Sequence, residues 1–410
     1  MKVSIPWNSQ SVSDYLHLER YVNDGSPTGF TEVHKTSPST NPFTASDHFP
    51  ILEFSDNDCD VRLLGKDCEY LRGAVNFAHP DSVQSPTLSG AARKVVVSPV
   101  VVSPVAGGRT MLVREGEGGP GYLKLTYDFS RIGRVDRQLS LRHCMSSIEV
   151  SNVLETALDR GYLGNNCALL REPSARVTIL GTGESYEWGT IFRERAPYPY
   201  VSEARAIVPG FSLFGRDRKD ANHKALILQF IDLGGYEPVQ YLMDLLLMII
   251  DSYWKIVTSC GLHIECHGQN CMFEVTPELR IVRFIVKDMD SVDKDIPLSR
   301  YLGVERDWAS RPYMCMDEGV YYYPIRASFM YDFKLGMYML DPLIQVVCSA
   351  FRLNQQEIES NVRDHVRAHY IGKLPPSYFP GDGCWYDCDN TERKPGTRRE
   401  YFPHPNPRFR

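Results

Sequence analysis

The stretch Gly261-Leu-His-Ile-Glu-Cys-His-Gly-Gln-Asn270, with Phe284-Ile-Val-Lys-Asp288-Met-Asp290 after a short apolar run, decides how this chain is interpreted. It places two imidazoles, three carboxylates and two amides within thirty residues. Buried polar groups need hydrogen-bond partners, and a core rarely contains so many of them. We therefore expect a functional site here, with a satisfied structural network as the alternative.

The spacing of this stretch predicts a metal and phosphate site. Residues 281–286 are apolar and predict a strand that leads to Asp288. If the strand forms a hairpin with the segment that follows Asn270, Asp288 lies beside Asn270. Amide and carboxylate oxygens are ligands that hold Mg²⁺ against nucleotide phosphates. Glu265, His267 and Gln269 alternate, so they share one face if the segment is extended.

The composition indicates a globular chain of enzyme size without a binding signature for polyanions. Its 410 residues, 43% of them hydrophobic, can bury a large core and favour two or three subdomains. The 45 basic and 51 acidic residues are interspersed, which argues against nucleic-acid or anionic-membrane partners. The chain begins without a signal-peptide pattern, and its longest apolar run, near Leu245 to Ile250, is too short to cross a bilayer. We expect a cytoplasmic protein.

The cysteines do not predict a disulfide framework. Eleven of them are scattered along the chain without a Cys-x-x-Cys pair, which favours free thiols. Cys384 and Cys388 stand four apart, but no second pair lies near enough in sequence to complete a metal site.

Three regions follow from the pattern of the chain, which predicts an α+β fold. Residues 1–55 are rich in Ser, Thr, Pro and Asn and predict an extended N-terminal arm. Residues 56–235 carry short apolar and alternating runs punctuated by Gly and Pro, which predict a mostly antiparallel sheet. Residues 236–410 begin with a long apolar helix and predict a mainly helical domain. Two local predictions are a helix capped by Ser147 and a buried strand at 225–231.

A glycine-rich turn after an apolar strand is a candidate phosphate-binding loop. Gly107 and Gly108 allow the backbone to approach a ligand closely, while Arg109 and Thr110 supply a charge and a hydroxyl. Lys124 follows in an alternating strand, on the opposite face from its two leucine neighbours. Taken alone, the turn is an ordinary β-turn and the lysine an exposed sheet residue.

Together, these residues resemble the siderophore synthetases that work independently of nonribosomal peptide synthetases, the aerobactin-synthetase (IucA/IucC) family. The family's Glu-x-His-x-Gln-Asn element matches residues 265–270 at every position, and its Arg-Asp element appears as Lys287-Asp288. Its Ser-x-Arg-Thr phosphate element corresponds to residues 107–110, with Gly in place of Ser. Its strand lysine corresponds to Lys124.

Further motifs extend the resemblance from about residue 75 to the end of the sequence. The family arginine that follows the strand lysine falls on Arg137, or alternatively Arg134. His79 begins an imperfect echo of the family's His-Pro-Trp-Gln, and Asn406-Pro407 corresponds to its closing Asn-Pro. The family's N-terminal thumb region has no counterpart in this sequence.

The resemblance implies a cupped-hand architecture, with a finger-like β region and a helical palm that contains a small kinase-like sheet. It also implies an ATP- and Mg²⁺-dependent ligase that adenylates a carboxylic acid, commonly citrate or a derivative. The acid then condenses with an amine or alcohol in the biosynthesis of a siderophore or a related secondary metabolite. The resemblance leaves open whether the protein forms a homodimer.

The resemblance and the residue chemistry together assign roles to individual positions. The assignments are catalytic for His267, Lys124 and Arg137; nucleotide binding for Gly107, Gly108, Arg109, Thr110, Lys124, His267 and Asn270; substrate binding for His79, Arg137 and Gln269; and Mg²⁺ binding for Glu265, Asn270 and Asp288.

Two other functional classes remain. A phosphotransferase that uses the same kinase-like palm would yield ADP rather than AMP. A catalytically degenerate nucleotide-binding homologue is suggested by the replacement of the family Ser by Gly107. The nucleotide product separates these classes from the ligase.

Overall fold

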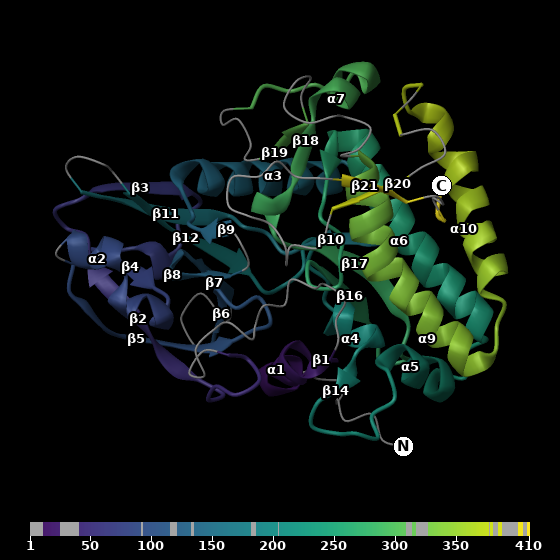
Figure 1. Cartoon of the computed structure of the whole chain (residues 1–410), viewed down its shortest axis with the longest axis horizontal. Coiled ribbons are helices and arrows are strands. Elements are labelled where there is room, and N and C mark those ends of the chain that lie inside the picture. The colour runs from purple at the N-terminus through teal and green to yellow at the C-terminus, as the bar shows by residue number, and fades with distance from the viewer. Residues whose placement is uncertain are drawn as a thin grey trace.

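The computed structural model in Figure 1 describes most of the chain, and the statements below concern those residues. The described residues are 11–24, 41–91, 93–114, 121–132, 135–181, 186–203, 205–308, 314–316, 327–376, 378–379, 384–387, 401–404 and 408–410.

One end of the molecule is an eight-stranded antiparallel sheet (Figure 1). The strand order is β3-β11-β12-β7-β6-β5-β2-β4. The strands are β2 (Phe49–Ser55), β3 (Asp60–Gly65), β4 (Val75–Ala78), β5 (Val95–Pro104), β6 (Thr110–Val113), β7 (Gly121–Leu125), β11 (Ser174–Leu180) and β12 (Tyr186–Glu194). All residues of β6 and β7 are buried, so Lys124 is buried as well. The predicted antiparallel sheet is confirmed.

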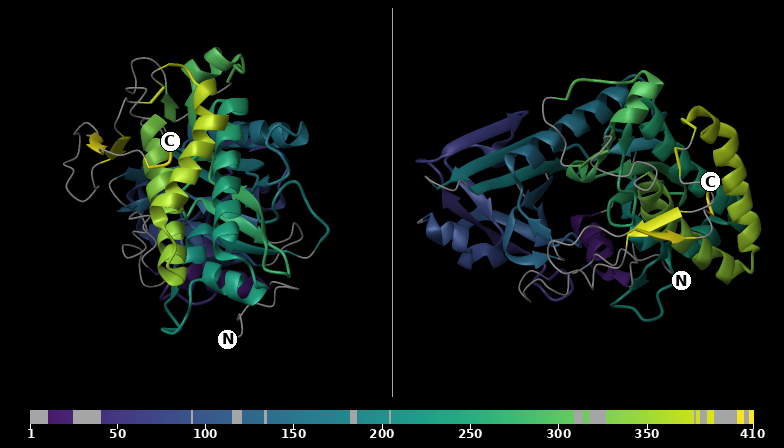
Figure 2. Two further views of the ribbon diagram at one scale, coloured as in Figure 1. Left: turned by 90° about the vertical axis from the view of Figure 1, so that its right-hand side faces the viewer. Right: turned by 45° about the horizontal axis from the view of Figure 1, so that its top comes forward.

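The other end is mainly helical and surrounds a four-stranded mixed sheet (Figure 2). Its order is β10-β17-β16-β13, with β10 parallel to β17 and the other pairs antiparallel. These strands are β10 (Cys167–Leu169), β13 (Ala206–Pro209), β16 (Cys271–Val275) and β17 (Ile281–Val286). The main helices are α6 (Pro238–Cys260), the π-helix η5 (Phe329–Leu340), α9 (Asp341–Phe351) and α10 (Gln355–His369). Their apolar faces form the largest buried core of the described chain.

Shorter elements complete the described fold. They are β1 (Val22–Asp24), η2 (Glu69–Leu71), η3 (Pro80–Gln84), α2 (Pro86–Gly90), β8 (Tyr127–Ile132), β9 (Val135–Arg137), α4 (Gly210–Phe214), β14 (Arg216–Asp217), β15 (Leu262–His263), η4 (Met289–Ser291), β18 (Asp293–Asp295), α7 (Ile296–Leu302), β19 (Met314–Met316), η6 (Ile371–Lys373), β20 (Cys384–Asp387) and β21 (Tyr401–His404).

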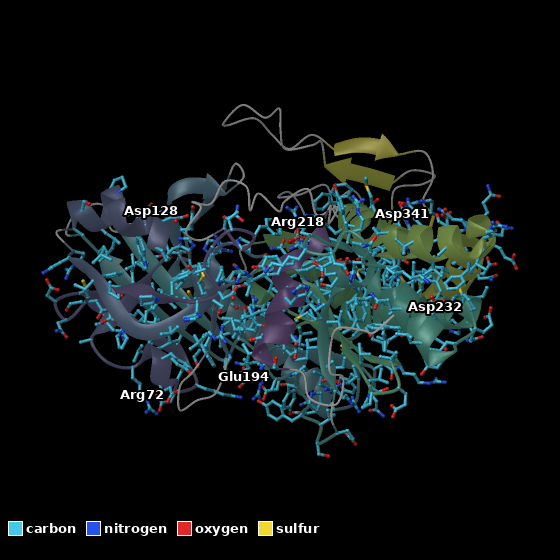
Figure 3. All side chains as sticks on the ribbon, turned by 90° about the horizontal axis from the view of Figure 1, so that it is seen from below. Arg72, Asp128, Glu194, Arg218, Asp232 and Asp341 are labelled. Atoms are coloured by element: carbon cyan, nitrogen blue, oxygen red, sulfur yellow. The ribbon has the colours of Figure 1, made fainter. Side chains whose placement is uncertain are left out.

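Helix α1 (Val12–Tyr21) lies between the two ends. Figure 3 shows it from below, with Arg72 and Asp128 on the sheet side and Asp232 and Asp341 on the helical side. Tyr15 and Leu16 of α1 pack in one cluster with residues of both sheets. The N-terminal arm was expected to be extended, so this buried helix is a correction within residues 1–55. A capping box at Ser11 and tertiary burial outweigh the weak periodicity of the sequence.

Two other local predictions require correction. Residues 225–231 were expected to form a strand, but they belong to helix α5 (Leu226–Gly234), which packs against α4 and α9. A short apolar run fits either element, and burial among helices decided this one. The helix predicted to begin after Ser147 is α3 (Leu141–Asp159), with Ser140 as its N-cap. Ser147 is buried inside α3, where its hydroxyl donates to Glu172.

Two general expectations concern the chain as a whole. No helix among the described residues is long and apolar enough to cross a membrane. The eight cysteines whose side chains are described are free thiols. Cys388 and the side chain of Cys384 lie outside the described part, as does the Asn406-Pro407 motif.

Candidate active site

The β16–β17 hairpin brings Asn270 next to the segment that contains Asp288. Cys271 is paired with Val286, and the amide of Lys287 donates to the carbonyl of Asn270 over 3.2 Å. The predicted hairpin is therefore confirmed. The backbone of Asp288 is left-handed, with φ of 75°, a conformation that residues other than glycine rarely adopt. Such backbone strain is concentrated at functional sites in proteins.

Lys124 from the large sheet reaches across to the carboxylates that follow the hairpin. Its Nζ lies 2.5 Å from Oδ1 of Asp288 and also contacts Oδ1 of Asp290. Only 2% of the lysine side chain is exposed. One buried ammonium is therefore shared by two acids that come from the other end of the molecule.

Two arginines add positive charge to this acidic pair. Arg193 in β12 lies 2.7 Å from Oδ1 of Asp288, and it also donates to the buried carboxylate of Glu172. Arg109 lies 3.4 Å from Oδ2 of Asp290. We call Lys124, Arg109, Arg193, Asp288 and Asp290 the aspartate centre. Arg193 is buried, and nothing in the sequence pattern around it indicates this.

The cations of the aspartate centre keep its acids ionised. Burial alone would raise the pKa of Asp288, but Lys124, Arg193 and Arg109 outweigh it and hold that pKa well below its usual range. Burial and the neighbouring Asp288 oppose ionisation of Asp290, and Lys124 with Arg109 still lowers its pKa. The centre therefore combines fixed charges of both signs in a buried place.

His143 on the first turn of α3 faces the same charges, and the sequence gave no role to it. Burial lowers its pKa, and Asp290 acts in the opposite direction. Arg109 and Lys124 lower the pKa further. Because α3 packs against η4, an imidazole from the helix lies at the edge of the aspartate centre.

The glycine loop lies beside the stretch from which the sequence was interpreted. A Cβ atom added to Gly107 would lie 3.7 Å from Nε2 of Gln269 and 3.5 Å from the side chain of Thr110. Gly108 has φ of 69°, which glycine adopts without strain. The loop and the 265–270 stretch are therefore neighbours, and a Cβ atom at position 107 would be in ordinary van der Waals contact with both.

His79 supports this loop from inside the protein. Its ring is fully buried, and Nε2 lies 3.0 Å from the carbonyl of Gly108. The amide of Asp81 donates to Nδ1, so the proton lies on Nε2 and is donated to Gly108. Burial lowers the pKa of His79 to about 4. This placement suits a residue that fixes the loop better than one that contacts the substrate.

A second acidic residue, Glu265, has a different partner. Its Oε1 lies 2.5 Å from Nζ of Lys334 in helix η5, and its Oε2 lies 3.7 Å from Nε2 of His267. Burial opposes ionisation, but Lys334 and His267 lower the pKa of Glu265 well below its usual value. We call Glu265, His267 and Lys334 the glutamate centre. Two charged residues inside the apolar run 329–340, Asp332 and Lys334, were the sequence signal that could have revealed it.

The motif itself is a turn and not the extended segment that the alternation suggested. The amides of Asn270 and Cys271 both donate to the carbonyl of His267. The amide of Gln269 donates to Nδ1 of His267, which leaves the proton on Nε2 toward Glu265. Burial lowers the pKa of His267, while Glu265 acts to raise it. Glu265, His267 and Gln269 therefore do not share a strand face.

The other imidazole of the stretch is structural. His263 is fully buried and lies 2.7 Å from the hydroxyl of Tyr253 and 3.1 Å from a carboxylate oxygen of Asp295. The hydroxyl of Tyr378 is 2.5 Å from its Nε2 and 2.9 Å from the same oxygen of Asp295. At His263 the alternative interpretation, a satisfied structural network, is therefore the right one.

The residues predicted to bind Mg²⁺ fit that ion only in part. No group of three or more histidine, cysteine, aspartate or glutamate side chains within the described ranges is placed to hold a metal. Asp288 and Asn270 have the oxygen donors that Mg²⁺ uses when nucleotide phosphates supply other ligands. Glu265 does not fit the set, because both of its oxygens already face nitrogen atoms, those of Lys334 and His267. The side chain of Arg137, a predicted catalytic residue on β9, lies outside the described part.

Comparisons with known proteins bear on the fold. No protein-family model matches the sequence, and no curated protein matches it. Petrobactin biosynthesis protein AsbB from Bacillus anthracis is similar in structure, with a TM-score of 0.69 and 16% identity, over 88% of this chain and 68% of AsbB. ATP-bound aerobactin synthetase IucA from Klebsiella pneumoniae gives a TM-score of 0.68 at 12% identity, over 90% of this chain and 70% of IucA.

The chain has the fold of these siderophore synthetases. Aerobactin synthetase IucC from Klebsiella pneumoniae is similar as well, with a TM-score of 0.61 and 13% identity, over 80% of this chain and 64% of IucC. The predicted siderophore-synthetase fold is confirmed. At this level of identity the similarity concerns the arrangement of the elements, so roles for single residues rest on the geometry above.

Proposed function

We propose that this protein is an ATP-dependent ligase that activates a carboxylic acid as an acyl-adenylate and joins it to an amine or alcohol. The acid we expect is citrate-like or another polycarboxylate, and the product is a siderophore or a related metabolite. An aerobactin synthetase of the same fold is known in an ATP-bound form, which supports the use of ATP.

One observation carries the proposal. Lys124 in β7 and Arg109 in the loop between β5 and β6 meet Asp288 and Asp290 from the helical end. The glycine loop lies against Gln269 at the same place. Cations that can bind phosphates, a loop that allows close approach and oxygen donors for a metal are thereby brought together from distant parts of the chain.

The residues act on ATP by position and charge. Arg109, Thr110 and Lys124 bind phosphate oxygens, and His267 donates from Nε2 to a phosphate or to the carboxylate. A carboxylate oxygen of the acid attacks the α-phosphorus, the bond to the β-phosphate breaks, and pyrophosphate leaves. The amine or alcohol then attacks the acyl carbon, and AMP leaves. Fixed cations favour the first step because negative charge accumulates on the departing phosphates.

Mg²⁺ would be held by Asp288 and Asn270. When bound, it would neutralise phosphate charge. Lys124 contributes positive charge in the same region. Its ammonium lies beside the carboxylates of Asp288 and Asp290 and can turn to phosphate oxygens when a nucleotide binds.

The test is the identity of the products. Purified protein is incubated with ATP, MgCl₂, a panel of di- and tricarboxylates and a panel of amines and amino alcohols, and nucleotides and pyrophosphate are quantified. We expect AMP and pyrophosphate to be formed in equal amounts with at least one acid. ADP as the nucleotide product would instead indicate a phosphotransferase, and unchanged ATP across the panel would indicate a degenerate homologue.

A matched pair of variants assigns the activity to this site. Lys124→Met should lower AMP formation by about 10²–10³-fold, because it removes the ammonium shared by Asp288 and Asp290. Lys66→Met removes a lysine whose side chain is 56% exposed and which pairs with Glu155. It should behave as the unchanged protein does.

A further inference from the structure

The carboxylate of Glu265 has a fixed cation of its own. Lys334 Nζ lies 2.5 Å from Oε1, and only 5% of the lysine side chain is exposed. The other oxygen faces Nε2 of His267 at 3.7 Å. Both oxygens of Glu265 therefore face nitrogen atoms of the protein, and a metal ion there would lie beside a buried ammonium of like charge.

Helix η5 holds Lys334 in this position. Two residues before it, Asp332 accepts from Nε of Arg410 at 2.9 and 3.1 Å and from the hydroxyl of Ser328 at 2.6 Å. The hydroxyl of Tyr331 donates to the carbonyl of Phe409 over 2.8 Å. The turn that carries Lys334 is thus fastened to residues 408–410.

The backbone of η5 packs tightly against residues 408–410. A Cβ atom added to Gly336 would lie 3.1 Å from the ring of Phe409, so the helix and residues 408–410 are in close contact. The π-helical turns place Lys334 opposite Glu265, and such turns often occur at functional sites. A lysine held this way is a stable counter-ion and not a temporary one.

The aspartate centre differs in its cations. Lys124 is shared between Asp288 and Asp290, and in the proposed function it turns to phosphates when a nucleotide binds. Lys124 and Arg193 both contact Oδ1 of Asp288, whereas Oδ2 accepts from the neutral hydroxyl of Ser291 over 3.1 Å and suits a metal ion. Lys334 extends from the same end of the molecule as Glu265, on helix η5.

We propose that Lys334 occupies the position of a metal ion at Glu265. Glu265 is then a positioning residue that orients His267, and the metal that accompanies the nucleotide is bound at Asp288 and Asn270 without it. The statement about the metal at Asp288 and Asn270 rests on the proposed function. The counter-ion role of Lys334 concerns the protein without any ligand.

The first measurement is a double-mutant cycle on stability in EDTA. Lys334→Met, Glu265→Gln and the double variant of the full chain are unfolded with urea. Lys334→Met leaves a carboxylate without its counter-ion, and Glu265→Gln removes that charge, so the double variant should be more stable than Lys334→Met. The coupling should change the folding equilibrium constant by at least about tenfold.

Two controls complete the cycle. Lys334→Arg keeps the charge and should retain most of the stability. Arg300 and Glu305 form an ion pair at 3.1 Å with side chains 58% and 54% exposed, and the cycle of Arg300→Met with Glu305→Gln should give a coupling below about fivefold. Equal, small coupling in both cycles would overturn the proposal.

The second measurement uses Mn²⁺ as the probe, followed by electron paramagnetic resonance of the ATP-loaded protein. Glu265→Gln should bind Mn²⁺ within about threefold of the unchanged protein, whereas Asp288→Asn should bind it about tenfold or more weakly. Equal weakening in both variants would make Glu265 a metal ligand and overturn the proposal. If the unchanged protein took up no Mn²⁺ with ATP, the proposed function would fail, and the stability cycle would still decide the counter-ion role.

Discussion

The aspartate centre and the glutamate centre lie in one site but obtain their positive charge from different parts of the chain. The cations of the first come from the large sheet, while its acids follow strand β17 at the helical end. The second pairs Glu265 with Lys334, both from the helical end. A charge shared across two parts of the fold can be transferred to a ligand that binds between them, whereas a pair within one part keeps its geometry. The aspartate centre therefore suits binding, and the glutamate centre suits positioning.

The largest expected effect breaks the aspartate centre. Lys124→Met leaves Asp288 and Asp290 buried without the ammonium they share. Loss of one partner of a buried pair should lower the free energy of unfolding by about 3–5 kcal/mol. Loss of a phosphate-binding cation should lower AMP formation by about 10²–10³-fold. Urea unfolding and product analysis measure the two effects.

A rescue experiment separates these effects. The double variant Lys124→Met with Asp290→Asn removes one uncompensated acid, so it should recover part of the stability without recovering activity. Recovery of both would show that Lys124 serves only to keep the acids folded, and the proposed phosphate contact would then be wrong.

The sequence predicted the hairpin and the acids of the aspartate centre because both depend on local order. Residues 281–286 are apolar and end at Asp288, so strand and acid are adjacent in the chain. The loop 107–110 and Lys124 were found by their residue types and by the family resemblance. The contacts of Lys124 and Arg109 with Asp290 were not predictable from spacing, since they join positions 166 and 181 residues apart.

The sequence failed where burial among helices decided the structure. Lys334 was missed because a lysine in an apolar helix has no local pattern that indicates its partner. The run 225–231 was assigned to a strand, and α1 to an extended arm, because periodicity does not report what an element packs against. The turn at 267–270 likewise depends on backbone hydrogen bonds to His267 that alternation does not reveal.

The next effect tests the support behind the glycine loop through pH. Burial lowers the folded-state pKa of His79 to about 4, whereas an unfolded histidine has a pKa of about 6.5. The unfolded chain therefore takes up the proton first, and this contribution to stability is complete above pH 6.5 and lost as the pH falls from 6.5 to 4. The loss amounts to about 3 kcal/mol.

His79→Gln isolates this term, because Gln keeps a donor for the carbonyl of Gly108 and does not titrate. Urea unfolding of both proteins between pH 7.5 and 4 should show a steeper decline for the unchanged protein. Parallel curves would mean that the folded-state pKa of His79 is not lowered, and the acceptor role of Nδ1 toward the amide of Asp81 would then be wrong.

A smaller effect is expected at the glutamate centre. Lys334→Met should lower the free energy of unfolding by about 2 kcal/mol, less than Lys124→Met, because one side is a single carboxylate that solvent partly screens. The Glu265 side chain is 20% exposed, compared with 5% for Asp290. The maximal rate should fall more than the apparent affinity for ATP, since Glu265 acts through His267. A change confined to ATP affinity would place Lys334 among the phosphate-binding residues.

The smallest effect concerns α1, which braces the strand that carries Lys124. Tyr122 and Lys124 are two residues apart in β7 and share one face of the strand. The hydroxyl of Tyr122 donates to that of Tyr15 over 2.6 Å, and Tyr15 donates to Glu19 over 3.1 Å. Tyr122→Phe removes the first bond and leaves the second, so it should cost about 1 kcal/mol in urea unfolding.

AMP formation by Tyr122→Phe should change little, because the charges of the aspartate centre remain in place. A loss of activity as large as that of Lys124→Met, with stability lowered only slightly, would mean that α1 sets the position of Lys124. The two centres would then differ in the elements that hold Lys124 and Lys334 in place, and also in the parts of the fold that supply these lysines. In that case the variant Tyr15→Phe, which also lacks a donor to Glu19, should lose activity at least as strongly.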